Sequence, residues 1–279
     1  MKTQPLKGMR DLLPREQALR DYIQGQILAT YRAAGFQRIS TPILEDMENL
    51  DKSDGGDNLN LIFKVLKRGD KLEHALASGD EKQLSDMGLR YDLTLPLSRY
   101  YAANRNELPS PFKVIQTDRV YRAERPQKGR LRQFHQVGIE CLGAEAPTVD
   151  AEAIIMLMRF YERIGIPRAN MRLLLNSMGC EKCRPAYREQ VRDFIRAHAG
   201  ELCEECNHRA EVNPLRAFDC KNPDCAAVMA SAPKITDHLC PECREHYAAV
   251  KELLDAAGLT YVEDPKLVRG LDYYTRTVF

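Results

Sequence analysis

Eight of the nine cysteines lie within residues 180–243, and they form four closely spaced pairs. The pairs are Cys180–Cys183, Cys203–Cys206, Cys220–Cys225 and Cys240–Cys243. Thiolates at such spacing are the usual ligands of structural zinc, which takes four of them in a closed tetrahedral site. We therefore predict two structural zinc sites built from neighbouring pairs, the first with the second and the third with the fourth. The alternative is a small helical insertion in which reduced cysteines only pack.

A second set of chemically capable residues lies in the segment QFHQVGIECLG (133–143). Side chains alternate across a strand, so Phe134, Gln136, Gly138 and Glu140 share one face. The other face receives His135, Val137, Ile139 and Cys141, and we expect it to be core with Cys141 buried. Because glycine has no Cβ, a ligand could approach the polar face at Gly138 while Glu140 accepts its hydrogen bond. The alternative is a face that is simply solvated.

Two neighbouring segments carry matching polar residues. In RVYRAE, Arg122 shares a face with Val120 and Glu124, and an arginine fork on a strand suits a phosphate oxygen. In LRYDLT, Asp92 and Thr94 share a face with Arg90 and could hold an ammonium group. The sequence therefore predicts one pocket that binds an anion and a cation together.

The sequence contains neither a GxxxxGKS/T nor a GxGxxG phosphate loop, so arginines would have to neutralise any bound phosphates. Residues 119–132 hold six Lys/Arg and only one acid, Glu124. This density favours a phosphate-facing loop over a solvated face.

The elements that must position these residues follow from periodicity. We expect helices at 15–34 and 148–164, and near 186–199 and 238–257. The extended piece RISTPIL (38–44) contains Pro42, which indicates an edge or interface strand. Residues 48–88 look like hairpins and loops with a strand in LIFKVLK. Closely spaced strands from 89 to 143 predict an antiparallel sheet, and strands return after Gly258.

Composition bounds the class of protein. The 279 residues are 44% hydrophobic and 29% charged, which allows a sizeable core in an α+β fold. A net charge of +1 means that any nucleic-acid contact must be local. The sequence has no apolar run long enough for a membrane span and no signal-type N-terminus. With reduced cysteines this predicts a cytoplasmic protein without membrane contact.

Four segments together resemble the histidyl-tRNA synthetases: GMRDLLP (8–14), LRYDLT (89–94), DRVYRAERPQKGRLRQFHQVGIECLG (118–143) and LVRGLDYYTRTVF (267–279). The resemblance covers essentially the whole chain. It implies the class II synthetase fold, an antiparallel sheet flanked by helices in a homodimer. It also implies activation of L-histidine by ATP and Mg²⁺, followed by transfer to the 3′ end of tRNA(His).

The resemblance also implies residue roles. Arg269 and Arg122 would be the catalytic arginines at the α-phosphate of ATP, and Glu124 and Arg130 would accompany Arg122 around the nucleotide. Pro42 falls in the segment that forms the dimer in this family. The histidine-binding residues would be Asp92, Leu93, Thr94, Gln136, Glu140, Tyr273 and Tyr274. Many bacterial members have Glu where this chain has Asp92. Gly270 would supply the turn that lets Arg269 point into the site.

The domains expected on this basis are a first part of the catalytic domain (1–169), a Cys-rich and mostly helical insertion (170–257) and a return into the catalytic domain (258–279). The family's third motif and anticodon-binding domain are not in the sequence, so we expect a catalytic-domain fragment that is inactive alone. In the family this insertion lies near the tRNA acceptor stem. Its arginines at 184, 188, 192, 196 and 209 could contact phosphates or be plain helix-surface charge.

Two other readings stay open. The histidine-sensing regulatory subunit of ATP phosphoribosyltransferase is a synthetase paralogue that lacks the anticodon domain, but it tends to lose the arginines that correspond to Arg122 and Arg269. A zinc-knuckle RNA-binding protein would explain only residues 180–243.

Overall fold

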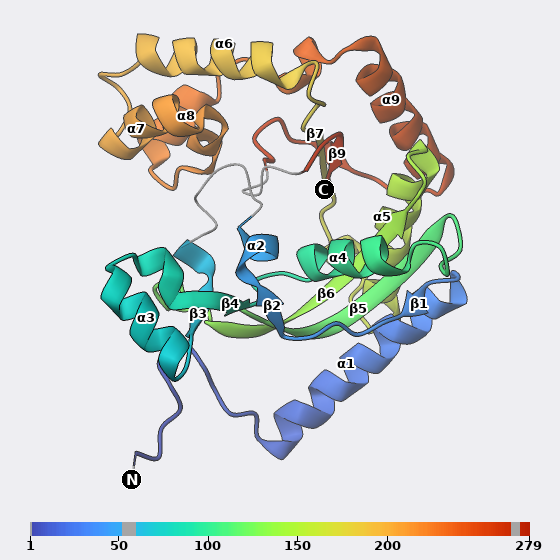
Figure 1. Cartoon of the computed structure of the whole chain (residues 1–279). Coiled ribbons are helices and arrows are strands. Elements are labelled where there is room, and N and C mark those ends of the chain that lie inside the picture. The colour runs from blue at the N-terminus through green and yellow to red at the C-terminus, as the bar shows by residue number, and fades with distance from the viewer. Residues whose placement is uncertain (1, 52–59, 269–273) are drawn as a thin grey trace. The chain divides into compact units, whose positions relative to one another are not determined.

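The computed structural model describes residues 2–51, 60–268 and 274–279, and the described residues form two compact units, Met1–Ala144 and Glu145–Phe279 (Figure 1). Each unit is α+β, as the sequence predicts. The predicted boundaries near 169/170 and 257/258 remain a prediction. No helix among the described residues is both long and apolar enough to cross a membrane.

Unit 1 (Met1–Ala144) carries two small sheets. The first has the order β1-β5-β6, with a parallel β1–β5 pair and an antiparallel β5–β6 pair, and the second has the antiparallel order β2-β4-β3. The strands are β1 (Gln37–Arg38), β2 (Leu44–Asp46), β3 (Phe63–Leu66), β4 (Ser85–Leu89), β5 (Phe112–Tyr121) and β6 (Gln133–Leu142). The helices are α1 (Pro14–Ala33), α2 (Met47–Leu50), α3 (Asp70–Ser78) and α4 (Thr94–Asn104), with a 3-10 turn at Glu81–Leu84.

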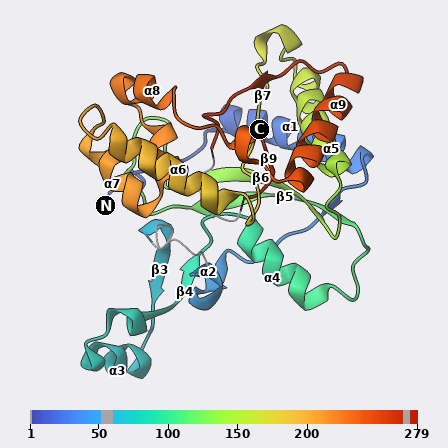
Figure 2. The same ribbon diagram turned by 90° about the horizontal axis from the view of Figure 1, so that it is seen from above.

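The ribbon of β5 and β6 is the long element of unit 1, and its ten-residue strands pair throughout (Figure 2). Phe112 and Val114 of β5 pack with Leu97 of α4 in a buried cluster. This packing fixes α4 against the ribbon, because burying such side chains contributes roughly 1.5–3 kcal/mol each.

The predicted helix at 15–34 is present as α1, which has a proline in its first turn and Gly35 in the left-handed region just past its end. Only the C-terminal half of its apolar stripe is buried, as at Ile27 and Tyr31. Leu19 and Tyr22 are exposed, so the predicted stripe faces a core along only half of the helix. The tract 48–88 contains the predicted β3 strand, but also helix α3, which the loop interpretation missed.

Unit 2 (Glu145–Phe279) has one sheet of order β8-β7-β9, in which β7 pairs parallel with β8 and antiparallel with β9. The strands are β7 (Leu174–Ser177), β8 (Val262–Glu263) and β9 (Thr277–Val278). The helices are α5 (Pro147–Arg163), α6 (Arg184–Ala197), α7 (Glu204–Val212), α8 (Pro223–Met229) and α9 (Pro241–Ala256), with 3-10 turns at Arg168–Asn170, Pro214–Asp219 and Ile235–His238. The predicted helices correspond to α5, α6 and α9.

One buried cluster forms the core of unit 2. It joins Leu175 of β7, Val191 of α6 and Val250 of α9 to the buried cysteines of the Cys-rich segment. The cysteine pairs are therefore part of this core.

Candidate functional site

The polar floor predicted from the sequence lies on one face of the β5–β6 ribbon. The register pairs Gln136 with Asp118, Gly138 with Gln116 and Glu140 with Val114. Directly opposed residues of an antiparallel pair project to the same face. This face therefore combines an amide, a glycine and a carboxylate, as the alternation predicts.

Glu140 is half-buried on this floor, and Thr94 Oγ1 donates a hydrogen bond of 2.9 Å to its Oε1 atom. Burial raises the pKa of Glu140, and the charge of Asp92 raises it further, although the Thr94 bond acts in the opposite direction. Asp92 is 2% exposed and accepts a hydrogen bond of 3.2 Å from the backbone N–H of Leu95. Two carboxylates that repel each other in a partly dry site gain most from a cationic ligand.

The prediction that Arg90, Asp92 and Thr94 follow one strand is wrong. Strand β4 ends at Leu89, and helix α4 begins at Thr94. Pro96 has no N–H to give to a sheet but is tolerated in the first turn of a helix. Asp92 and Thr94 reach the floor from the turn that starts α4, whereas Arg90 enters the core.

Leu93 lies beside Gly138, and the approach of a ligand at this glycine stays a prediction. A Cβ added to Gly138 would lie 3.5 Å from Leu93 Cβ, an ordinary contact. Leu93 is 1% exposed, and its carbonyl accepts a hydrogen bond of 3.2 Å from Gln116 Nε2. Next to it, Gln136 Oε1 is buried without a hydrogen-bond partner in the described part of the chain. Gln136 therefore offers an acceptor to a ligand N–H.

Arg122 follows directly after β5 and is held on three sides. Its backbone N–H donates to Arg132 O at 2.9 Å, and its Nε donates to Tyr91 O at 3.1 Å. Its guanidinium lies over the ring of Phe134, 5.1 Å from the centroid. Because Nε and the ring fix the plane of the fork, Arg122 is oriented before any ligand arrives.

The basic loop after Arg122 is tied to the N-terminal segment. Arg132 donates its backbone N–H to Gly8 O at 2.7 Å, and Gly8 has a φ of 88°. A Cβ at Gly8 would lie 2.9 Å from Arg132 Cγ, so only glycine fits this close approach. Arg130 Nε lies 3.4 Å from Glu124 Oε2 in an ion pair that is half-exposed on the arginine side.

The opposite face of β6 is not the core that the sequence predicts. Val137 is 42% exposed, and Cys141 is half-buried. His135 contacts Arg20 Nη1 of α1 through its Nδ1 atom. Burial lowers the pKa of His135, and the charges of Arg20 and Arg119 lower it further. Polar side chains of α1 lie against part of this face, as Arg20 does against His135.

Arg90 is a structural residue that the sequence reasoning misplaced. It is fully buried, and it donates to Arg119 O at 3.0 Å and to Thr41 O at 2.8 Å. Its Nη2 atom lies 2.7 Å from Asp118 Oδ2. Arg90 therefore ties Thr41, just before Pro42, to the C-terminal part of β5 at Asp118 and Arg119.

Replacing Glu140 by glutamine tests the electrostatic strain at the floor. The unfolded chain releases the Glu140 proton near its ordinary pKa of 4.5, whereas the folded chain releases it only at higher pH. The free energy of unfolding therefore falls as the pH rises through this window. We expect Glu140→Gln to raise the free energy of unfolding by about 1 kcal/mol at pH 7 and to leave it without such a gain at pH 4. Urea unfolding at both pH values measures this, and a loss of stability at pH 7 would contradict it.

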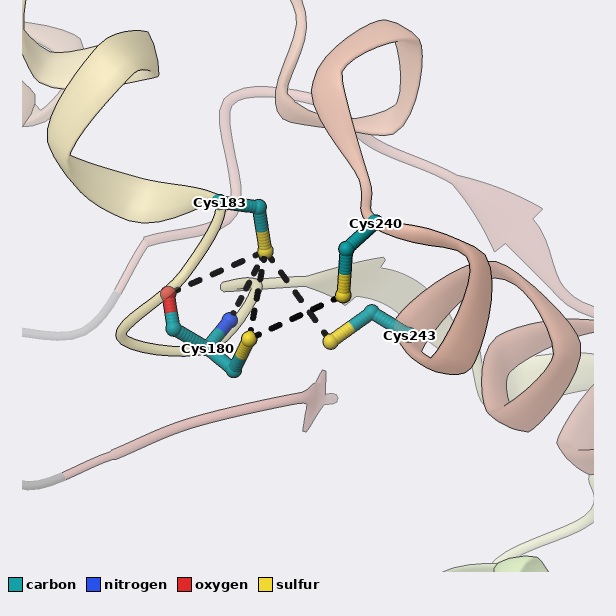
Figure 3. Close-up of side chains that lie close together, drawn as sticks. All are labelled: Cys180, Cys183, Cys240 and Cys243. Atoms are coloured by element: carbon teal, nitrogen blue, oxygen red, sulfur yellow. Dashed lines mark hydrogen bonds between the residues drawn. The ribbon is translucent and has the colours of Figure 1, made fainter.

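The cysteines of unit 2 form two clusters, and within each cluster the four sulfur atoms lie within 4.8 Å of one another. The outer cysteine site comprises Cys180, Cys183, Cys240 and Cys243, and Figure 3 shows the four side chains converging. Its sulfur–sulfur distances are 3.6 Å for 180–183, 3.8 Å for 180–240 and 3.9 Å for 183–243. Burial acts to raise the pKa of Cys180, but hydrogen bonds from the backbone N–H groups of Cys183 and Lys182 and from the side chains of Cys183 and Cys243 together outweigh it and lower the pKa to about 6.

The inner cysteine site comprises Cys203, Cys206, Cys220 and Cys225. The sulfurs of Cys203 and Cys220 are 3.9 Å apart, and the Cys203 N–H donates to Cys225 Sγ at 3.2 Å. The backbone N–H of Cys206 contributes to lowering the pKa of Cys203 to about 7.

The predicted combination of neighbouring pairs is therefore wrong. The first pair joins the fourth, and the second joins the third. The reason is tertiary. The first and fourth pairs lie at the starts of α6 and α9, and both helices pack on the core that contains β7.

The arginines of the insertion are mostly engaged with the protein. Arg192 and Arg209 form ion pairs within their own helices, and Arg196 pairs with Glu211 at 2.9 Å. Arg184 donates to the backbone carbonyl of Tyr274. These contacts favour surface charge and local structure over a free phosphate-binding stripe.

Four predicted residues come after unit 1 in the sequence. Arg269, Gly270 and Tyr273 lie outside the described residues, and Tyr274 belongs to unit 2. Their convergence with Asp92, Arg122, Gln136 and Glu140 stays a prediction.

The fold is similar to that of solved structures of known proteins. An apo histidyl-tRNA synthetase from S. aureus superimposes with a TM-score of 0.70 at 29% identity, covering 99% of this chain and 60% of that one. A Bacillus halodurans protein described as an ATP phosphoribosyltransferase regulatory subunit/histidyl-tRNA synthetase gives a TM-score of 0.67 at 20% identity, covering 99% and 72%. The second likeness shows the fold alone. Together they define an α+β protein with the fold of a histidyl-tRNA synthetase.

The chain belongs to the histidyl-tRNA synthetase family, whose family model matches residues 8–279. A histidine–tRNA ligase of Desulforamulus reducens is 39% identical over 278 residues, which is 98% of this chain and 62% of the relative. One of Solidesulfovibrio magneticus is 37% identical over 279 residues, 100% of this chain and 63% of the relative. The chain thus spans under two thirds of the length of these curated relatives.

Proposed function

We propose that this chain supplies the histidine- and ATP-binding face of a histidine–tRNA ligase. The observation that carries the proposal is the strained carboxylate pair of Glu140 and Asp92 on the β6 floor, with the oriented fork of Arg122 on the same ribbon. An amino acid joined to a phosphate presents the ammonium and anion that such a site would balance.

In this proposal Asp92, Thr94 and Glu140 hold the α-ammonium and imidazole groups of L-histidine, with the backbone of Leu93 and the amide of Gln136 beside them. The open Oε1 acceptor of Gln136 fits an N–H of the ligand. Tyr273 and Tyr274 would lie against the imidazole.

The chemistry that the site must support is attack of the histidine carboxylate on the α-phosphate of ATP, which forms histidyl-adenylate and releases pyrophosphate. A carboxylate is already a nucleophile, so the site needs alignment and positive charge more than a general base. Arg122 and Arg269 would face the α-phosphate, and Glu124 and Arg130 would flank the nucleotide with Mg²⁺. Transfer of histidine to the 3′ end of tRNA(His) would follow.

We also propose a cytoplasmic homodimer. Pro42 lies between β1 and β2 and not inside the strand that the sequence predicts around it, and the adjacent Ile43 and Leu44 are 39% and 47% exposed. Exposed apolar side chains around a proline that cannot donate to a sheet suit a subunit interface.

The test of the proposed function is histidine-dependent ATP–pyrophosphate exchange by the full-length gene product, beside calorimetric titration of this chain with histidine. A ligase gives both exchange and binding. Histidine binding without exchange would instead support a regulatory, histidine-sensing protein. The absence of both pyrophosphate exchange and histidine binding would overturn the proposal.

We further propose that zinc occupies both cysteine sites. A tetrahedron with Zn–S bonds of about 2.3 Å has S···S edges of about 3.8 Å, and the measured distances of 3.6–3.9 Å agree with it. With four thiolates the coordination is closed, so the metal would be structural.

Elemental analysis of the purified chain should give about two zinc ions per chain, since each four-thiolate site holds one. Cys203→Ser/Cys220→Ser should reduce this to about one. Detection of no zinc in protein purified without chelator would contradict the assignment.

A further inference from the structure

The backbone that carries Tyr274 is bonded to the loop of the outer cysteine site within unit 2. Strand β9 pairs with β7 through Ser177 and Thr277. The pairing continues beyond both strands, because Met178 N–H donates to Arg276 O at 2.6 Å and Arg276 N–H donates to Gly179 O at 2.8 Å. Gly179 is the residue immediately before Cys180. The two segments are thus bonded right up to the first metal-ligating cysteine.

A side chain from the other end of the same loop completes the link. Arg184 follows Cys183 as the first residue of α6. Its Nη2 atom donates to the carbonyl of Tyr274, and its Nε donates to Met178 O at 3.4 Å. One guanidinium therefore spans both segments, and its position depends on where Cys183 is held.

Gly179 couples the sulfur of Cys183 to this backbone. Its φ is 64°, and a Cβ on it would lie 2.7 Å from Cys183 Sγ. The sulfur thus rests directly on the residue whose carbonyl holds Arg276. A displacement of Cys183 Sγ toward Gly179 would therefore press on this backbone, because protein interiors are close-packed.

Arg276 needs such support. It has a φ of 57°, a conformation that is uncommon for a residue other than glycine. Its guanidinium lies 3.7 Å from Glu145 Oε2 and donates to Glu145 O at 3.3 Å. A backbone in this region persists only where its surroundings over-determine it.

We propose that metal in the outer cysteine site positions the segment 274–278, and thereby sets the affinity for histidine, whereas metal in the inner cysteine site does not. The effect on histidine affinity rests on the proposed function, in which Tyr273 and Tyr274 contact the imidazole. The outer site is thus a positioning device for the substrate segment.

The chain supplies a matched control, because the inner cysteine site has the same four thiolates. Its hydrogen bonds join parts of the insertion to each other, as between Cys203 and Cys225. The comparison is Cys180→Ser/Cys240→Ser against Cys203→Ser/Cys220→Ser, each checked by elemental analysis for loss of one metal ion.

Hydrogen exchange on this chain measures the positioning itself. The Arg276 amide should exchange at least about tenfold faster in the outer-site variant, because loss of local order raises the population of the open state. It should be unchanged in the inner-site variant. Equally faster exchange of the Arg276 amide in both variants would overturn the proposal. Unchanged exchange in an outer-site variant shown to lack its metal ion would also overturn it.

Two further variants keep this test independent of metal loss. Arg184→Ala retains all eight cysteines and should keep both metal ions while accelerating exchange at Arg276 to a similar extent. Arg184→Lys should restore part of the protection, since lysine keeps a donor without the fork. An unchanged amide in Arg184→Ala would refute the coupling through this residue.

The proposed effect of the outer cysteine site on histidine affinity is tested on the full-length gene product. In pyrophosphate exchange, the outer-site variant should raise KM for histidine about tenfold to a hundredfold, the cost of slight misplacement of a binding group, with a smaller change in kcat. The inner-site variant should leave KM unchanged. The absence of ATP–pyrophosphate exchange by the unmodified protein would contradict the proposed function. The amide hydrogen exchange of Arg276 would still decide whether the outer cysteine site positions the segment 274–278.

Discussion

Replacing Arg122 by alanine should lower the rate of histidine-dependent ATP–pyrophosphate exchange by about 10²–10³-fold, the usual cost of removing one preorganised donor from a developing charge. Arg122 is oriented by its Nε bond to Tyr91 O and by the Phe134 ring. Its fork therefore requires little reorganisation when ATP binds. The measurement is steady-state exchange by the full-length gene product.

Three comparisons make this result specific. Arg122→Lys keeps the charge but loses the fork, so it should retain part of the activity. Arg105→Ala removes an exposed arginine at the end of α4 and should leave exchange unchanged. Arg269→Ala should match Arg122→Ala, because both residues are assigned to the same phosphate. If Arg122→Ala shows the wild-type rate of ATP–pyrophosphate exchange and unchanged thermal unfolding, the role assigned to Arg122 at the α-phosphate is wrong.

Replacing Arg90 by methionine should lower the free energy of unfolding by about 3–5 kcal/mol, because each buried acceptor left without its donor costs about 1–3 kcal/mol, while the loss of the ion pair counts for less since the Asp118 side chain is 35% exposed. Methionine fills the space but leaves the Thr41 and Arg119 carbonyls without their donor and Asp118 without its partner. Urea unfolding at pH 7 measures the loss. Arg105→Met, on the surface, should change stability by no more than about 0.5 kcal/mol.

The same variant has a pH signature. Burial acts to raise the pKa of Asp118, but the hydrogen bonds from Arg90 and from the Arg119 N–H outweigh it, so the pKa lies below its ordinary 3.8. A lowered carboxyl pKa stabilises the fold above the ordinary value, and this contribution is lost as the pH falls through the lowered one. The gap between wild type and Arg90→Met should therefore shrink from pH 7 to pH 3. A constant gap would mean that the ion pair is not its source.

Strand alternation was sufficient to group Gln136 and Glu140 on one face, because the period of a strand is fixed by covalent geometry. It failed at LRYDLT, where Asp92 and Thr94 belong to the turn before α4. Pro96 and the buried Leu97 contained the signal for a helix start. The role of Arg90 could not be predicted, because its partners come from Thr41 and Asp118, far away in sequence.

The cysteines show a different limit. Their spacing predicted eight candidate ligands in two sets of four, since pairs two to four residues apart can share one ion. The combination of pairs depends on which helices pack together, and no local pattern encodes that. The cluster of Cys180 with Cys240 is a property of the core of unit 2.

The nested arrangement of the clusters also has an evolutionary consequence. Because Cys180 and Cys240 lie side by side, the polypeptide between them departs from and returns to one place. A change of length between the end of α6 and the start of α9 can leave Cys180 and Cys240 in place, and with them the register of β7 and β9. Differences in length among relatives would then be concentrated between α6 and α9. Substitutions at Cys180 and Cys240 would occur only together.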